Sequence, residues 1–218
     1  MGCPTLTLKG SGDGSNDDTA RQLLCEMLRL FYAKGWVSGT GGGICGFDGK
    51  HRLLVAPTGR HKETLRPGDF FVIDPASGDV LQPADEERLR PSECAGVFCT
   101  VIGSRDAGAV MHSHALDAVL AADLGDEWLT LRGFEMLKGI PGVVSSDEHR
   151  VPIIENTPRE TELVQGVERA LADVRFAETH AVLVRDHGAY IWGRDIWETK
   201  KHAEVYHWLF EAMRARRS

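Results

Sequence analysis

The spacing of apolar residues predicts a helix near each end of the chain. After Asn16 and Asp17, which are favourable helix N-caps, apolar residues recur with a helical period, and we expect the helix to end near Gly35. Residues 194–217 predict a long helix whose basic final turn would complement the helix dipole. Residues 1–15 are rich in glycine, serine and threonine and show no period, so a mobile tail is expected there.

Short apolar runs between these helices, bounded by proline or glycine, predict strands. The runs lie at residues 52–57, 70–74, 107–114, 151–155 and 181–193, with helical patterns at residues 91–105, 114–124 and 158–174. The last run reads as two strands that meet at His187 and Gly188, and Pro91 stands near the first turn of its helix. Strands and helices do not alternate strictly, so we expect an α/β fold of three layers (α/β/α), with a central, mostly antiparallel sheet covered by helices. No repeat or linker interrupts residues 16–218, which predicts a single domain.

Composition and charge narrow the classes of partner. The 218 residues include 25 basic and 32 acidic ones, a net charge of −7, which argues against nucleic acid or an anionic membrane surface as the main partner. No apolar run is long enough to span a bilayer, and the first residues show neither a secretory signal nor a full myristoylation pattern, so a cytoplasmic protein is expected. Five cysteines without a CxxC pair argue against a disulfide framework and against a thiolate zinc finger.

Two histidines, His112 and His114, stand at the end of a predicted strand. Side chains at i and i+2 share one face of a strand, with Cα atoms about 6.5–7 Å apart, so both imidazoles could bind one metal ion. His187 also ends an apolar strand, and three protein ligands with one open position are typical of catalytic zinc. The alternative is that the two histidines only donate hydrogen bonds to carbonyls at a strand end.

A zinc enzyme of this kind needs a group that transfers protons. Glu135 stands among apolar neighbours in the sequence, where loss of water would raise its pKa into the range useful for acid–base catalysis; the alternative is a solvated or salt-bridged carboxylate. Glu93 and Cys94, near a predicted helix start, are weaker candidates, and a thiol at that position is expected to have a lowered pKa.

A glycine-rich loop at residues 38–43 could bind an anion through its backbone N–H groups. It matches neither a Walker motif nor a dinucleotide fingerprint, because no Lys-Ser or Lys-Thr pair follows it and a strand, not a helix, comes next. Thr58 and Gly59, after the next strand, could supply further phosphate donors. The alternative is a plain turn.

Together these stretches resemble the class II aldolase/adducin superfamily and, within it, the family of methylthioribulose-1-phosphate dehydratases. The resemblance runs from about residue 20 to residue 212. It is carried by FYAKGWVSGTGGGI, VAPTGRHKE, VMHSH, EMLKGI, VPIIENTP and VLVRDHGAYIWG, of which EMLKGI, VPIIENTP and HGAYIWG separate this chain from the sugar-phosphate aldolases.

The resemblance implies a role for each matching position. One zinc ion per subunit would be bound by His112, His114 and His187, with Glu135 as the general acid/base and Cys94 in contact with substrate. The phosphate loops would fall on Thr40, Gly41, Gly42, Thr58 and Gly59, and Ser92 matches a phosphate-binding serine of the aldolases. Glu93 matches an aldolase glutamate that acts as ligand or base, so its role here stays open. Gly43 stands near a position where many members carry asparagine, so phosphate binding would rely more on backbone donors.

The implied activity is a zinc-dependent hydro-lyase of methionine salvage. It would convert 5-methylthioribulose 1-phosphate to 2,3-diketo-5-methylthiopentyl 1-phosphate and water, in a homotetramer with active sites near subunit boundaries. The base that removes the C3 proton could be Glu135 itself, Cys94 or a water on the zinc. The alternatives are a class II zinc aldolase that cleaves a sugar phosphate and, less favoured, a non-catalytic adducin-like interaction protein.

Overall fold

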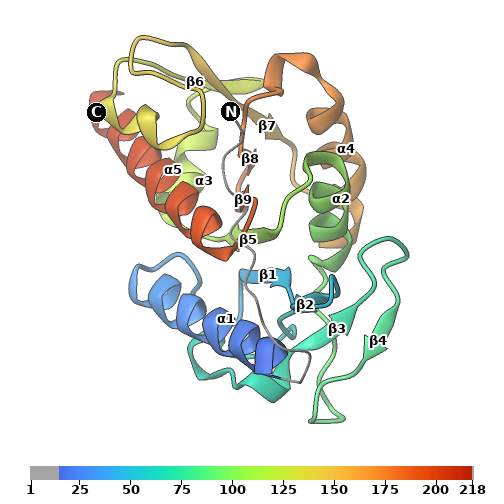
Figure 1. The fold of residues 1–218 in the computed structure, drawn as a ribbon. Helices are drawn as coiled ribbons and strands as arrows, with labels where there is room; N and C mark the ends of the chain where they lie inside the picture. The colour runs from blue at the N-terminus through green and yellow to red at the C-terminus, as the bar shows by residue number, and fades with distance from the viewer. Residues whose placement is uncertain (1–14, 218) are drawn as a thin grey trace, which may run out of the picture.

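Residues 15–217 are described by the computed structural model, and within them nine strands form one sheet (Figure 1). The strands are β1 (Gly43–Phe47), β2 (Leu53–Val55), β3 (Phe71–Ile73), β4 (Val80–Gln82), β5 (Ala109–Ser113), β6 (Trp128–Leu131), β7 (His149–Ile154), β8 (Ala181–Val184) and β9 (Gly188–Gly193). Their order across the sheet is β4-β3-β2-β1-β5-β9-β8-β7-β6, and every neighbouring pair is antiparallel except β7 and β8, which are parallel. The predicted mostly antiparallel sheet is therefore confirmed.

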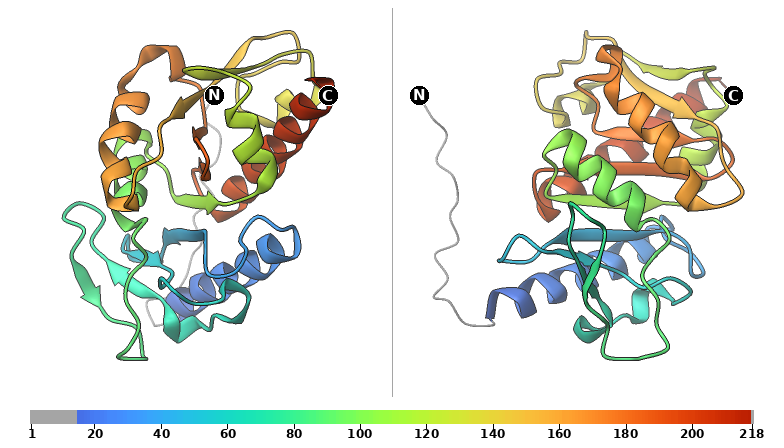
Figure 2. Two further views of the ribbon diagram at one scale, coloured as in Figure 1. Left: turned by 180° about the vertical axis from the view of Figure 1, so that it is seen from behind. Right: turned by 90° about the vertical axis from the view of Figure 1, so that its right-hand side faces the viewer.

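Helices cover both faces of this sheet, as the three-layer prediction requires. They are α1 (Ser15–Ala33), α2 (Ala95–Arg105), α3 (Leu116–Ala122), α4 (Val164–Ala172) and α5 (Ile196–Arg217). The side chains of α1, α3 and α5 pack into one hydrophobic core, and those of α2 and α4 pack into the other. Figures 1 and 2 show α2 beside α4 on one side of β8 and β9, with α3 and α5 on the opposite side.

Strand alternation supplies both cores at once. On β5, Ala109 and Met111 face the core under α1, α3 and α5, whereas Val110 faces the core under α2 and α4. On β9, Ile191 faces the core under α1, α3 and α5, and Trp192 faces the core under α2 and α4. The central strands are thus buried on both faces, which explains why they read as continuous apolar runs.

Two helices begin later than the sequence pattern predicts. Pro91 does not enter the first turn of α2, because it forms an isolated antiparallel bridge with Pro57 and the helix begins only at Ala95. The pattern predicts helix from residue 158, but α4 begins at Val164 and is preceded by a 3₁₀ turn. The pattern also fails to indicate β4 and β6, the two edge strands of the sheet.

The tail predicted for residues 1–15 falls, apart from Ser15, outside the described residues, and so does Ser218. Within residues 15–217, no helix combines the length and the apolar character that a membrane span requires.

Candidate functional site

Three imidazoles meet where β5 ends and β9 begins. His112 lies on β5 opposite Tyr190 of β9, His114 follows β5, and His187 directly precedes β9. The Nε2 atom of His112 lies 2.8 Å from that of His114 and 3.2 Å from that of His187, and the last two are 3.2 Å apart. Zinc–nitrogen bonds of about 2.0–2.1 Å in a tetrahedron separate the nitrogens by roughly 3.3 Å, so this triangle fits one metal ion.

Hydrogen bonds to the other ring nitrogens favour the same conclusion. Nδ1 of His112 lies 3.2 Å from the carbonyl oxygen of Ala189, and Nδ1 of His187 lies 2.9 Å from Oδ1 of Asn156. Both oxygens accept a hydrogen bond from an Nδ1–H group, which leaves an unprotonated Nε2 directed at the other imidazoles. Lone pairs that converge in this way repel one another unless a cation lies between them.

Burial favours the neutral form of two of these imidazoles, those of His112 and His114. It lowers the pKa of fully buried His112, and burial together with the neighbouring His112 lowers the pKa of His114 to about 3. A neutral imidazole is the form that binds a metal ion, so no proton has to leave either histidine near neutral pH.

Glu160, which the sequence analysis did not identify, adds a carboxylate to the histidines. Its Oε1 lies 2.7 Å from Nε2 of His112 and 3.4 Å from Nε2 of His187, and it begins the 3₁₀ turn Glu160–Leu163 ahead of α4. Burial alone would raise the pKa of Glu160, but its close contacts with His112 and His187 hold it well below its usual range. The ligand atoms of Glu160 and the three histidines lie within 4.8 Å of one another, which is a donor set suited to zinc.

The sequence offers one weak signal for Glu160. Pro158 comes soon after the buried strand β7 and disfavours a continuous helix at that point. Glu160 is therefore expected near the end of a strand and not inside a helix. Only the sheet order, in which β7 lies beside β8 and β8 beside β9, shows that this strand end adjoins His187.

Cys94 lies beside Glu160 at the start of α2, and its pKa differs from the expected one. Its Sγ donates a hydrogen bond to Oε2 of Glu160 over 3.1 Å. Burial, reinforced by the negative charge of Glu160, raises the pKa of this thiol well above its usual range. The expected lowering by the helix N-terminus is therefore wrong, because loss of water outweighs the helix dipole, and the thiol stays protonated at neutral pH.

A pocket of about 450 Å³ opens beside the histidines. Residues that the sequence analysis singled out line much of it: Thr40, Gly41, Gly42, Thr58, Ser92, Glu93, Cys94, His114 and His187. Gly59 is not among the lining residues, and His112 lies beneath them with no exposed surface. The two loops predicted to bind phosphate therefore lie at the same pocket as the histidines.

Gly41 brings the glycine loop against His114. A Cβ atom at position 41 would lie 2.6 Å from Nδ1 and 2.9 Å from Cε1 of that ring, and both distances are shorter than the contacts that a Cβ atom makes in proteins. Glycine is therefore required here because the loop backbone packs directly on the imidazole.

We expect Gly41→Ala to displace the His114 ring and to weaken zinc binding about 10- to 100-fold, the usual effect of losing support for a ligand. The measurement is competition for zinc with a chromophoric chelator. Gly43→Ala is the matched control, because a Cβ there would meet only Cε of Lys62, at an ordinary 3.8 Å. Equal zinc affinity of the two variants would contradict this role for Gly41.

Glu135 does not lie in the environment that its sequence neighbours suggest. It begins the 3₁₀ turn Glu135–Gly139, its side chain is 77% exposed, and its Oε1 pairs with Nζ of Lys138 at 2.6 Å. It does not line the pocket of its own chain. The expected desolvation is therefore wrong for a single chain, because neighbours in sequence do not cover the carboxylate in space.

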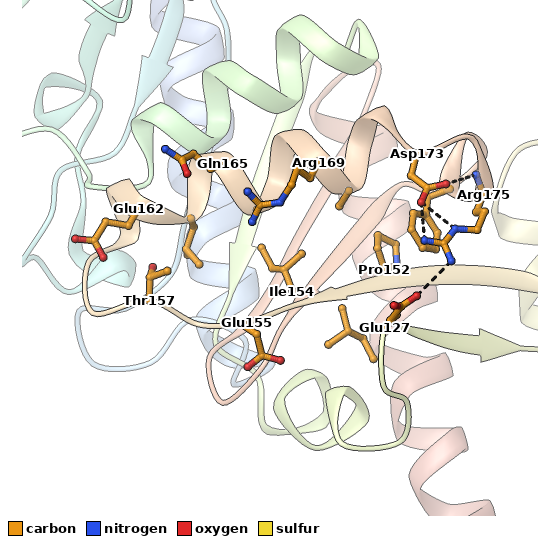
Figure 3. A pocket seen from close by; sticks show the side chains of 15 residues that line it. Glu127, Pro152, Ile154, Glu155, Thr157, Glu162, Gln165, Arg169, Asp173 and Arg175 are labelled. Carbon is orange, nitrogen blue, oxygen red and sulfur yellow. Dashed lines mark hydrogen bonds and ion pairs between the residues drawn. The ribbon is translucent and has the colours of Figure 1, made fainter.

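A larger hollow of about 720 Å³ lies between β7 and α4 and shares Thr157 with the smaller pocket. Figure 3 shows that Arg175 in this hollow is paired to both Asp173 and Glu127. No histidine or cysteine lines it. Within the described part of the chain, the chemistry of a metal site gathers at the smaller pocket.

Comparison with known proteins agrees with this geometry. Residues 22–213 match the family described as Class II Aldolase and Adducin N-terminal domain. The chain is 40% identical over 215 residues to the methylthioribulose-1-phosphate dehydratase of Gallus gallus, covering 94% of this chain and 87% of that protein. It is 42% identical over 200 residues to the protein of the same name in Xenopus tropicalis, covering 88% and 82%.

Among solved structures, an L-fuculose 1-phosphate aldolase has the same fold. Its TM-score is 0.74 at 19% sequence identity, with 91% of this chain and 86% of the aldolase covered. The histidine and carboxylate cluster thus stands on a fold used by sugar-phosphate enzymes, whereas the close relatives are dehydratases. The chain belongs to the class II aldolase/adducin family and, within it, to the family of methylthioribulose-1-phosphate dehydratases.

Proposed function

We propose that this chain dehydrates 5-methylthioribulose 1-phosphate to 2,3-diketo-5-methylthiopentyl 1-phosphate, a step of methionine salvage. One observation carries the proposal: three imidazoles and a carboxylate converge on one point, in a chain 40% identical to a named methylthioribulose-1-phosphate dehydratase over 94% of its length. The pocket beside them has the loops expected to bind a phosphate.

The donor set fits zinc as its resident metal. His112, His114 and His187 would hold the ion through Nε2, and Glu160 would supply an oxygen in the absence of substrate. Zinc bound there would act as a Lewis acid that polarises the C2 carbonyl of the ketose and makes the C3–H bond more acidic.

The side chains of the protein handle the protons. A base removes the C3 proton, the electron pair moves towards the C2 oxygen, and the C4 hydroxyl leaves as water after accepting a proton. Cys94 is disfavoured as this base because its thiol stays protonated, which leaves Glu135 and a water on the zinc as candidates. Of these two we propose Glu135, which would take the C3 proton and give it to the C4 hydroxyl. The resulting enol then tautomerises to the diketone.

The position of Glu135 favours a role beyond its own chain. Its carboxylate lies outside the pocket of the chain that carries it, so we propose that it reaches the pocket of a neighbouring subunit in a homotetramer. Cys94 would contact the substrate from inside the pocket, with Thr40, Gly42, Thr58 and Ser92 around the phosphate.

The test is an assay of metal-analysed protein with 5-methylthioribulose 1-phosphate, which follows diketone and aldehyde products together. We expect the diketone, its formation lost on chelation and restored by zinc. An aldehyde would instead favour cleavage of the C3–C4 bond, the aldolase alternative that the shared fold keeps open. Absence of turnover with one zinc bound per chain would reject the substrate and leave the metal site standing.

A further inference from the structure

Lys62 carries a buried positive charge whose partners are all uncharged. It begins the 3₁₀ turn Lys62–Thr64, and only 2% of the residue is exposed. Its Nζ donates to three backbone carbonyl oxygens, those of Thr40 at 2.8 Å, Pro57 at 3.1 Å and Arg60 at 3.1 Å. Among the described residues no carboxylate hydrogen-bonds to this ammonium group, although the charges of Glu160 and Glu63 act on it from further away.

Such a charge is costly to bury. An ammonium group removed from water loses several kcal/mol of hydration, and carbonyl dipoles return only part of it unless an anion is nearby. Burial accordingly lowers the pKa of Lys62. A negatively charged ligand in the pocket would therefore be attracted to this ammonium group, even though the charges of Glu160 and Glu63 already act on it.

Lys62 lies where the expected phosphate would bind. It lines the same pocket as Thr40, Gly42 and Thr58, and its three carbonyl partners belong to the two loops that meet there. Among the described residues lining this pocket, it is the only lysine or arginine. Glu93, Glu160 and Asp186 line it too, and their charges would repel an anion that met no cation.

Some of the backbone amides expected to bind phosphate already have partners within the protein. The N–H group of Gly41 already donates to the carbonyl of Ser38, at 3.1 Å, and that of Thr58 donates to the carbonyl of Arg90, at 3.0 Å. Two of the expected donors are thus occupied within the protein. A cation between the two loops would offset this loss.

We propose that Lys62 binds the phosphate group of the substrate and makes this pocket selective for phosphorylated ketoses. The inference rests on the proposed function, because it assumes a sugar phosphate in this pocket. When the phosphate enters, one of its oxygens replaces a backbone carbonyl at Nζ, since a charge-assisted hydrogen bond is roughly twice as strong as one to a neutral carbonyl. The two remaining carbonyls keep the ammonium in place between the loops.

The first test measures binding of inorganic phosphate by isothermal titration calorimetry, with metal-free and zinc-loaded protein. We expect Lys62→Met, which keeps the length of the side chain but removes its charge, to weaken phosphate binding about 10- to 100-fold in both forms. Lys62→Arg should retain most of the affinity. Lys50→Met, which removes an exposed lysine in the turn between β1 and β2, is the control and should bind as the unaltered protein does.

The second test compares 5-methylthioribulose 1-phosphate with the same sugar lacking its phosphate. Lys62→Met should raise KM for the phosphorylated ketose by a much larger factor than it raises KM for the unphosphorylated one. Unaltered phosphate affinity in Lys62→Met, with a lowered melting temperature alone, would overturn the proposal and leave Lys62 a structural residue. Phosphate affinity that falls as expected in a protein with no dehydratase activity would reject the proposed substrate but retain Lys62 as an anion site.

Discussion

Replacing His187 with alanine is expected to reduce bound zinc from one ion per chain to almost none and to abolish dehydration. Three imidazole nitrogens within 3.2 Å of one another form the metal triangle, and removal of one leaves two imidazoles and a carboxylate. Loss of groups that merely support a ligand costs about 10- to 100-fold in metal affinity, so loss of the ligand itself should exceed that range. Metal content by mass spectrometry and the diketone assay measure both effects.

Two further variants make this prediction specific. Glu160→Gln keeps all three imidazoles, so its zinc affinity should lie between those of the unaltered protein and His187→Ala. His51→Asn removes an exposed imidazole remote from the pocket, at a position with φ of 59° that asparagine tolerates, and should leave both zinc content and activity unchanged. Stoichiometric, tightly bound zinc in His187→Ala would remove this histidine from the metal site.

Glu135→Gln is expected to keep zinc while turnover falls by about 100- to 10,000-fold, the usual contribution of general acid–base catalysis. The amide has the shape of the carboxyl group but cannot take the C3 proton or protonate the leaving hydroxyl. Since the side chain is 77% exposed, the free energy of unfolding should change by no more than about 0.5 kcal/mol. Full activity of this variant would exclude Glu135 from the reaction.

Oligomers that mix two variants test whether Glu135 acts in the pocket of its own chain or in that of a neighbouring subunit. If the carboxylate enters a neighbouring subunit, co-expressed Glu135→Gln and His187→Ala chains should regain roughly a quarter of the normal activity, because random mixing pairs intact histidines with an intact glutamate at that fraction of sites. Each variant alone should stay inactive. Mixed oligomers without activity would place Glu135 in the pocket of its own chain, reached by movement of its loop.

The sequence by itself determined the local features of this protein. The period of two along a strand puts His112 and His114 on one side of the chain. The glycine after His187 allows β9 to begin at once, because a Cβ at position 188 would clash with the carbonyl oxygen of Ser113. Continuous apolar runs predicted the central strands, because those strands are buried on both faces. These features depend on residues close together in the chain, and a pattern can therefore report them.

The tertiary structure alone decided which distant groups meet and which are exposed to water. The order β7-β8-β9 brings Glu160 to the histidines, and the packing of two loops buries the ammonium of Lys62 at the same pocket. It also buries Cys94, which reverses its expected pKa shift, and leaves Glu135 exposed among apolar sequence neighbours. Burial and long-range charge depend on which elements cover a side chain in space, and the identity of its neighbours in the chain does not specify that.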